Sequence, residues 1–209
     1  MGLLVAGFNY GAVNADEFND WYDTEHIPER SRVPGFINAE RWLGADDPKV
    51  SIATYDLQSL DVLRSPPYRA VAYENLSPWS KRMVGRCQRI CRFEADQIVP
   101  GSAAAPADAA GLLLVAMNVK PEVEAEFNDW YDTEHVPRFR QVPGCLAARR
   151  FHVTSGAQRY VAMYHLTGPE VVASEAWETA AITRWTLKLR PHISDWLRLV
   201  LRRYRRSAA

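Results

Sequence analysis

The sequence predicts an α+β fold made of two β-α-β-β-α-β units in tandem. The first observation is a repeat in constant register: GLLVAGFN from Gly2 is answered by GLLLVAMN from Gly111, and FNDWYDTEH from Phe18 recurs unchanged from Phe127. The second is the order of apolar runs, turn residues and helical patterns inside each copy, which matches between the copies. The chain is therefore predicted to be an internal duplication.

A segment rich in Pro and Ala, PGSAAAPADAAG, lies between the two copies and shows no hydrophobic periodicity. Such composition is typical of a linker. We therefore expect an N-terminal half at 1–99, a linker at 100–110 and a C-terminal half at 111–206.

Each half is expected to open with a strand and a helix. The apolar run at 2–9 is typical of a mostly buried strand. Asn14 or Asp16 can then cap a helix that runs to His26 and ends near Pro28. The same elements are expected from Gly111 onward.

The remaining elements of the first half follow from turn residues and prolines. We expect two strands at 35–43 and 51–57, joined by a turn at 44–48 that contains Gly, Asp and Pro. A helical region broken by prolines follows at 60–84, and a last strand at 89–99. This order is ferredoxin-like, with helices on one face of an antiparallel sheet. The other sheet face must be buried too, so the two units are predicted to pack as an intramolecular pseudo-dimer.

The charge balance of the chain excludes several classes of partner. Lys+Arg and Asp+Glu both number 25 in 209 residues, so neither a nucleic acid nor an anionic membrane surface is indicated. No apolar run approaches the roughly 20 residues of a membrane span. The three cysteines lack metal-type pairing and fit reduced thiols. We expect a soluble, cytoplasmic protein.

Two further strings carry a resemblance to a known family. EHIPERSRVPGF at 25–36 and EHVPRFRQVPGC at 134–145 resemble the signature of the EthD-like branch of the dimeric α/β-barrel superfamily. This resemblance implies one intramolecular barrel with pockets between sheet and helices, often working without a metal or organic cofactor. In isomerase-like relatives a histidine at the end of the first helix faces the cavity, and His26 and His135 match it. Relatives also include cyclases, cofactor-free monooxygenases, haem-dependent enzymes and ligand-binding domains, among which fold does not choose.

Four residues of the repeated string are candidates for catalysis. Residues three apart share a helix face, so Asp23 can orient His26, and Asp132 can orient His135. An imidazole suits acid–base chemistry at neutral pH. The helix C-terminus and the neighbouring carboxylates favour the protonated form, which suits an acid. The alternative is that each histidine only closes its helix.

Ten further residues are candidates for binding a substrate. Their aromatic rings, strand-end amides and guanidinium groups could contact an apolar molecule and its polar groups. The alternatives stay open: the aromatics fill the core, the amides are satisfied at strand ends, and the arginines lie on an exposed hairpin. The candidates are Tyr22, Tyr131, Asn9, Asn118, Trp21, Trp130, Tyr55, Tyr164, Arg41 and Arg150.

The sequence lacks the elements that carry metal, haem or nucleotide chemistry. There is no H-x-x-x-H, H-E-x-x-H or C-x-x-C-H element, and no nucleophile elbow, phosphate loop or dinucleotide fingerprint. We therefore expect no metal site and no cofactor.

These observations favour a cofactor-independent lyase or isomerase that performs isomerisation, elimination or cyclisation on a hydrophobic or aromatic small molecule. A non-catalytic binding or accessory protein is the alternative, and a cofactor-free monooxygenase is a further one. The expected partner is the small-molecule substrate, and the monomeric pseudo-dimer could pair again into a homodimer. The sequence leaves open which half holds the working site.

Overall fold

The computed structural model describes residues 1–206, which form two compact units. The N-terminal unit consists of Met1–Asp96, the short segment Thr154–Ala157 and the segment that starts at Tyr204. The C-terminal unit consists of Gln97–Val153 and Gln158–Arg203. Within residues 1–206, no helix combines the length and apolarity that crossing a membrane requires.

The sheet of the N-terminal unit has four antiparallel strands in the order β4-β1-β3-β2. Leu4 of β1 lies opposite Tyr55 of β3, and Ala6 lies opposite Arg92 of β4. This register places Leu4, Ala6 and Phe8 on one face of β1, because alternate residues of a strand share a face. The strands are β1 (Gly2–Asn9), β2 (Glu40–Gly44), β3 (Val50–Leu57) and β4 (Gln88–Val99).

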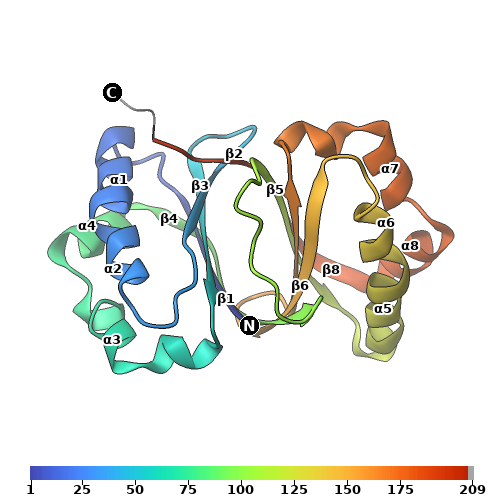
Figure 1. Ribbon diagram of the computed structural model, residues 1–209, viewed down its shortest axis with the longest axis horizontal. Coiled ribbons are helices and arrows are strands. Elements are labelled where there is room, and N and C mark those ends of the chain that lie inside the picture. The colour runs from blue at the N-terminus through green and yellow to red at the C-terminus, as the bar shows by residue number, and fades with distance from the viewer. Residues whose placement is uncertain (207–209) are drawn as a thin grey trace. The chain divides into compact units, whose positions relative to one another are not determined.

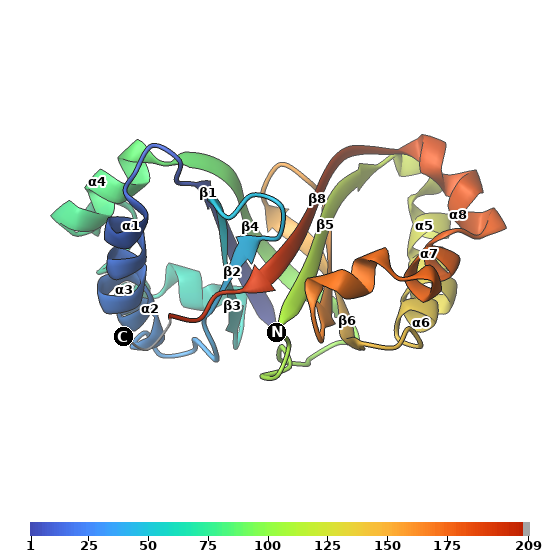
Figure 2. The same ribbon diagram turned by 90° about the horizontal axis from the view of Figure 1, so that it is seen from above.

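The helices of this unit lie on one face of its sheet (Figures 1 and 2). They are α1 (Ala15–Trp21), the π-helix Tyr22–His26, α2 (Ile27–Ser31), η2 (Leu60–Arg64), α3 (Pro66–Arg69), η3 (Tyr73–Asn75) and α4 (Pro78–Arg86).

The C-terminal unit has the same element order and the strand order β8-β5-β7-β6, again antiparallel. Its strands are β5 (Gly111–Val119), β6 (Cys145–Ser155), β7 (Tyr160–Leu166) and β8 (Ile193–Arg203). Its helices are η4 (Pro121–Val123), α5 (Glu124–Trp130), the π-helix Tyr131–His135, α6 (Val136–Phe139), η6 (Pro169–Ala173), α7 (Glu175–Ala181), α8 (Arg184–Leu189) and η7 (Arg190–His192).

Local sequence explains where the first helix begins and how it ends. The Asn14 side chain accepts hydrogen bonds from the backbone N–H of Asp16, at 2.8 Å, and of Glu17, which confirms the predicted N-cap. The expected α-helix does not continue to His26, however. Its last turn is a π-helix, in which the N–H of Ile27 reaches back to the carbonyl of Tyr22. The C-terminal unit contains the same π-helix at the same string.

The strand expected at 35–43 is shorter than predicted. Strand β2 begins only at Glu40, and Phe36 makes an isolated bridge to Leu57. Gly35 has φ +97°, and a Cβ there would come within 2.4 Å of the Val62 side chain. The Pro-Gly step therefore turns the chain before the strand can form, because only glycine fits this conformation and this space.

A buried arginine joins the helix layer to the sheet. Arg41 of β2 is 3% exposed, and its guanidinium donates to Asp23 Oδ1 at 3.0 Å and to Asn19 Oδ1 at 2.8 Å. It also lies over the rings of Tyr22, at 4.4 Å, and Tyr204, at 4.0 Å. The interpretation of Arg41 as an exposed hairpin residue is therefore wrong, since charge, hydrogen bonds and ring contacts all compensate its burial.

Arg150 of β6 repeats this arrangement in the C-terminal unit. It is 1% exposed, donates to Asp132 and, at 2.8 Å, to Asn128 Oδ1, and lies 4.1 Å from the ring centre of Tyr131. The expectation of an exposed hairpin is wrong here too. The repeated Asn and Asp of each string thus anchor an arginine, which gives them a structural role.

The glutamate of each string holds the neighbouring helix. Glu25 Oε1 accepts hydrogen bonds from Ser77, at 2.5 Å, and Ser80, at 3.1 Å, and Trp21 Nε1 donates to Ser80 at 2.9 Å. In the C-terminal unit Thr183 donates to Glu134 at 2.6 Å. The hydroxyl groups of Ser77 and Thr183 also cap the N-termini of α4 and α8. In each unit the same side chain therefore caps its helix and binds that helix to the glutamate of the repeated string.

Replacing the buried arginine should destabilise the protein strongly. We expect Arg41→Met to lower the free energy of unfolding by roughly 3 kcal/mol, because Asp23 then lacks its buried partner. Arg150→Met should have a smaller effect, because the side chain of Asp132 is 47% accessible and its charge stays hydrated. The exposed Arg64, whose side chain is 60% accessible, supplies the control Arg64→Met. Denaturant unfolding measures the change, and equal stability of Arg41→Met and Arg64→Met would contradict this role.

Candidate functional site

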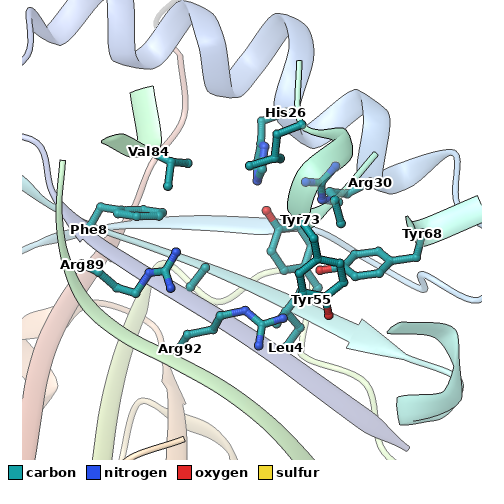
Figure 3. Close-up of a pocket in the computed structure, with 13 residues that line it drawn as sticks. Leu4, Phe8, His26, Arg30, Tyr55, Tyr68, Tyr73, Val84, Arg89 and Arg92 are labelled. Carbon is teal, nitrogen blue, oxygen red and sulfur yellow. The ribbon is translucent and has the colours of Figure 1, made fainter. Parts of the chain in front are cut away.

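The N-terminal unit contains a cavity of about 280 Å³ between its sheet and its helices (Figure 3). Its size is at the lower end of small-molecule pockets. The lining is apolar with a few polar groups, the usual composition of a ligand site. The lining residues are Leu4, Ala6, Phe8, His26, Arg30, Tyr55, Tyr68, Ala72, Tyr73, Leu76, Val84, Arg89 and Arg92.

His26, at the end of the π-helix, projects into this cavity from the helix layer (Figure 3). Its ring centre lies 4.6 Å from that of Trp21 and 5.2 Å from that of Tyr22, which fixes its orientation. Its Nδ1 is buried and has no hydrogen-bond partner. A buried nitrogen without a partner is costly, so a site-bound molecule that pairs with it would be stabilised.

The pKa of His26 is lowered, whereas the sequence predicted surroundings that favour the protonated form. Burial, followed by the charges of Arg30 and Arg41, holds the pKa of the imidazole well below its ordinary value. The prediction of a protonated histidine is wrong, because desolvation and two arginines outweigh the helix end and its carboxylates. His26 is therefore neutral at pH 7 and can accept a proton.

The predicted orientation of His26 by Asp23 is also absent. The carboxylate of Asp23 accepts hydrogen bonds from Arg41 and from the Tyr204 hydroxyl at 3.1 Å. The wider π-turn explains this, because residues three apart no longer share a face as they do in an α-helix. Asp132 likewise binds Arg150, while Nδ1 of His135 has no partner.

Arg30 lies beside His26 and also lines the cavity (Figure 3). It is 4% exposed, and its ion pair with Glu29 is long, at 3.4 Å. Arg30 is not among the predicted site residues. A signal was present in the sequence: Arg30 lies within EHIPERSRVPGF, and the matching position of the C-terminal string EHVPRFRQVPGC is Phe139.

Tyr55 supplies a hydrogen-bond donor on the sheet side of the cavity. Its hydroxyl is buried without a partner, as is that of Tyr22, which lies behind the lining. Burial holds the pKa of the Tyr55 phenol well above its ordinary value, so it stays protonated at neutral pH. Tyr55 is thus the one predicted binding residue that joins His26 in this cavity.

The other predicted binding residues have positions outside the lining. Asn9 and Asn118 lie at strand ends, where their Oδ1 atoms accept hydrogen bonds from the backbone N–H of Gly11 and Arg159. The remaining ones lie in the core of their units: Tyr22, Trp21 and Arg41 in the N-terminal unit, and Tyr131, Trp130, Tyr164 and Arg150 in the C-terminal unit.

Aromatic side chains take the corresponding positions in the C-terminal unit. Phe139 replaces Arg30 and packs against His135, with ring centres 4.7 Å apart. Trp177 replaces Tyr68 and lies 4.3 Å from Phe139. The larger Val115 replaces Ala6. His135 is therefore enclosed by rings, and the cavity found in this unit, beside Arg138 and Pro143, does not include it.

The chain matches no family model, and no curated protein is similar to it in sequence. Solved structures are similar in fold. An anthrone oxidase-like protein is 11% identical with a TM-score of 0.68, covering 98% of this chain and 92% of that one. A candidate monooxygenase from Fusobacterium nucleatum is 11% identical with a TM-score of 0.61, covering 97% and 91%. A haem-binding protein from Thermus thermophilus is 8% identical with a TM-score of 0.59, covering 97% and 90%.

At 8–17% identity, these likenesses show the fold alone. They leave the activity open, because the neighbours include an anthrone oxidase-like protein, candidate monooxygenases and a haem-degrading enzyme from Listeria monocytogenes.

The lining of the cavity contains one imidazole, that of His26, and no other His, Cys, Asp or Glu side chain. His135 of the C-terminal unit packs against the rings of Trp130, at 4.1 Å, and Phe139, and does not line the cavity found in that unit. Among residues 1–206, no group of three His, Cys, Asp or Glu side chains could hold a metal ion.

The buried histidines should make the protein sensitive to acid. Burial, Arg150 and Arg138 lower the pKa of His135 to about 3. The unfolded chain binds a proton near pH 6.5 and the folded chain does not, so stability is complete above pH 6.5 and falls as pH decreases toward 3. The loss should reach roughly 1 kcal/mol per pH unit for this histidine.

We therefore expect His135→Leu to have a shallower decline of unfolding free energy between pH 6 and 4 than the native chain. Urea unfolding at several pH values measures it. His152, which is only half-buried, supplies the control His152→Leu, and parallel pH profiles for all three proteins would contradict the assignment.

Proposed function

We propose that the protein is a cofactor-independent enzyme that performs acid–base chemistry on a hydrophobic or aromatic small molecule. The reaction class is isomerisation, elimination or cyclisation, and the site is the cavity of the N-terminal unit. One observation carries the proposal: a neutral histidine without a hydrogen-bond partner on Nδ1 lines a ligand-sized cavity beside a buried arginine.

In the first step the His26 imidazole accepts a proton from a carbon next to a substrate carbonyl. The C–H bond breaks, its electron pair forms an enolate, and the imidazole becomes an imidazolium. Tyr55 donates a hydrogen bond to the enolate oxygen, and the charge of Arg30 stabilises the developing negative charge in a site with little water. The same charge lowers the basicity of His26, so the site suits substrates with activated protons.

In the second step the imidazolium returns its proton. Delivery to a different carbon isomerises the substrate, and delivery to a leaving group completes an elimination. Attack of the enolate on a carbonyl of the same molecule gives cyclisation, with the proton going to the new alkoxide. Each route is redox-neutral and leaves His26 as it began, so no cofactor is required.

The finer family assignment belongs to the same proposal. The matched strings, strand orders and π-helices support a tandem duplication of ferredoxin-like units that form one barrel, with halves at 1–99 and 111–206 and a linker at 100–110. The EthD-like strings support that branch of the superfamily. We further propose a cytoplasmic protein with a small-molecule substrate and no nucleic-acid or membrane partner, acting as a monomeric pseudo-dimer or as its homodimer.

Oxygen-dependent chemistry is the second candidate, favoured by neighbours described as anthrone oxidase-like and as candidate monooxygenases. It shares the proton abstraction by His26. Dioxygen then oxidises the carbanion of an activated methylene: a C–O bond forms, the O–O bond breaks, the product is a ketone and the second oxygen leaves as water. A non-catalytic binding protein is the remaining alternative, in which His26 only pairs with a ligand.

Replacing His26 tests catalysis against binding. We expect His26→Gln to lower turnover of an activated aromatic ketone or lactone by at least about a hundredfold, because proton transfer is lost. Affinity should change little, since the cavity shape is kept. His135→Gln is the matched control and should retain turnover. Equal turnover in His26→Gln and His135→Gln, or a loss of affinity without a loss of turnover in His26→Gln, would contradict catalysis by His26 and favour the binding-protein alternative.

The pH profile gives an independent test of the base. Since the pKa of His26 is held well below its ordinary value, the base stays neutral as pH falls from 8 to 6.5. We therefore expect kcat/KM to be flat over this range and to fall only at lower pH. Steady-state rates measure it, and a decline centred at or above pH 6.5 would exclude His26 as assigned.

Oxygen consumption separates the two catalytic candidates. We expect turnover under nitrogen to equal turnover in air, with no dioxygen consumed at an oxygen electrode. Consumption of one dioxygen per product, and loss of turnover under nitrogen, would replace isomerisation by oxygenation while keeping His26 as the base.

A further inference from the structure

The charged residues that line the cavity are all positive. Arg30 projects from the helix side, whereas Arg89 and Arg92 project from strand β4 on the opposite side (Figure 3). The lining contains no aspartate or glutamate. A concave site with charge of one sign attracts ligands of the opposite sign.

Among the three arginines of the lining, Arg89 is the one whose side chain makes neither a hydrogen bond nor an ion pair with another side chain of residues 1–206. It is exposed and lies over the ring of Phe8, 5.9 Å from its centre. Its charge is therefore available to a molecule in the cavity.

Arg92 is half-buried and has one carboxylate partner. It donates to Glu94 Oε1 at 2.6 Å, and Glu94 lies beyond the cavity lining. The guanidinium also lies beside the Tyr68 phenol, where its charge opposes the effect of burial on the pKa of that phenol. Glu94 and the Tyr68 hydroxyl occupy part of the Arg92 guanidinium, which has five N–H donors, and leave the others for a further acceptor.

Unpartnered buried polar atoms indicate that a ligand belongs in this space. Tyr55, which is 1% exposed, has a hydroxyl without a partner, and so does Nδ1 of His26. The lining also contains apolar side chains: Leu4, Ala6, Phe8 and Val84. The cavity thus combines hydrogen-bonding groups and arginines with an apolar wall.

We propose that the substrate is an aromatic acid whose anionic group is held by Arg89 and Arg92. Its ring lies against Phe8, Leu4 and Val84, and its reacting carbon reaches His26 and Tyr55. This proposal rests on the proposed function and names the substrate class for that site. The cavity volume of about 280 Å³ limits the aromatic part to one or two fused rings.

The anionic group has a second consequence for the site. Its negative charge offsets the nearby arginines and favours a proton on the imidazole, so His26 becomes a stronger base when the substrate is bound. Fixing one end of the molecule also orients the reacting carbon, which lowers the entropic part of the barrier. The negative charge of the substrate thus contributes both to its binding and to the basicity of His26.

Calorimetric titration of the full chain with three probes of similar size tests the proposal. The probes are 2-naphthoate, 2-naphthyl phosphate and the neutral 2-naphthamide. We expect the two anions to bind at least about tenfold more tightly than the amide, because charge-assisted hydrogen bonds to guanidinium replace neutral ones. The difference should shrink at high salt. The ratio of naphthoate to naphthyl phosphate tells whether the site prefers a carboxylate or a phosphate.

Three variants locate the anion. Arg89→Gln should reduce the preference for naphthoate over naphthamide about tenfold, and Arg64→Gln, at an exposed position outside the cavity, should not. Glu94→Gln removes the competing carboxylate from Arg92 and should tighten naphthoate binding without tightening naphthamide binding. A purely structural role of Glu94 would not raise affinity for the anion alone.

The outcomes separate this inference from the proposed function. Equal affinity for naphthoate and naphthamide, a preference unchanged by Arg89→Gln and Arg92→Gln together, or no binding of any probe at millimolar concentration overturns the inference. None of these results bears on whether His26→Gln abolishes turnover. Conversely, a retained anion preference in a protein whose turnover ignores His26 would support the inference and contradict the proposed chemistry.

Discussion

The arrangement of helices on each sheet depends on a buried arginine and its carboxylate partner: Arg41 with Asp23, and Arg150 with Asp132. A guanidinium without its carboxylate could not remain in these positions, because an uncompensated buried charge is far more costly than an exposed one. The pair fixes where the first helix lies along the strand. Since the π-helix begins at Tyr22, whose ring contacts Arg41, this anchor also decides where His26 lies.

The order of strands and helices and the Asn14 cap could be predicted because they depend on local patterns: alternation, apolar runs and side-chain caps. The π-helix could not be predicted, because its hydrogen-bond pattern produces no recognisable hydrophobic periodicity within the nine residues of FNDWYDTEH. The burial of Arg41 was missed because its partners Asn19 and Asp23 are separated from it by the turn at Gly35. Long-range pairing of this kind is not visible in composition.

The candidate site was predicted only in part, and Arg30 shows why. The predicted site residues are mostly identical in the two copies, but several residues of the repeated string stabilise the fold. Asn19, Asp23 and Glu25 accept hydrogen bonds from side chains in neighbouring elements. The cavity instead depends on positions where the copies differ, since Arg30, Tyr68 and Ala6 give way to Phe139, Trp177 and Val115. Such differences acquire meaning only when a structure shows which of them face the same space.

The segment that starts at Tyr204 belongs to the N-terminal unit, where the Tyr204 ring lies 4.0 Å from Arg41 and its hydroxyl donates to Asp23. During synthesis the first unit emerges from the ribosome long before this residue does. Until then the Arg41–Asp23 pair lacks its outer aromatic cover and is open to water. The N-terminal unit is therefore synthesised first but completes its packing last, because it requires Tyr204, which is translated about 160 positions after Arg41.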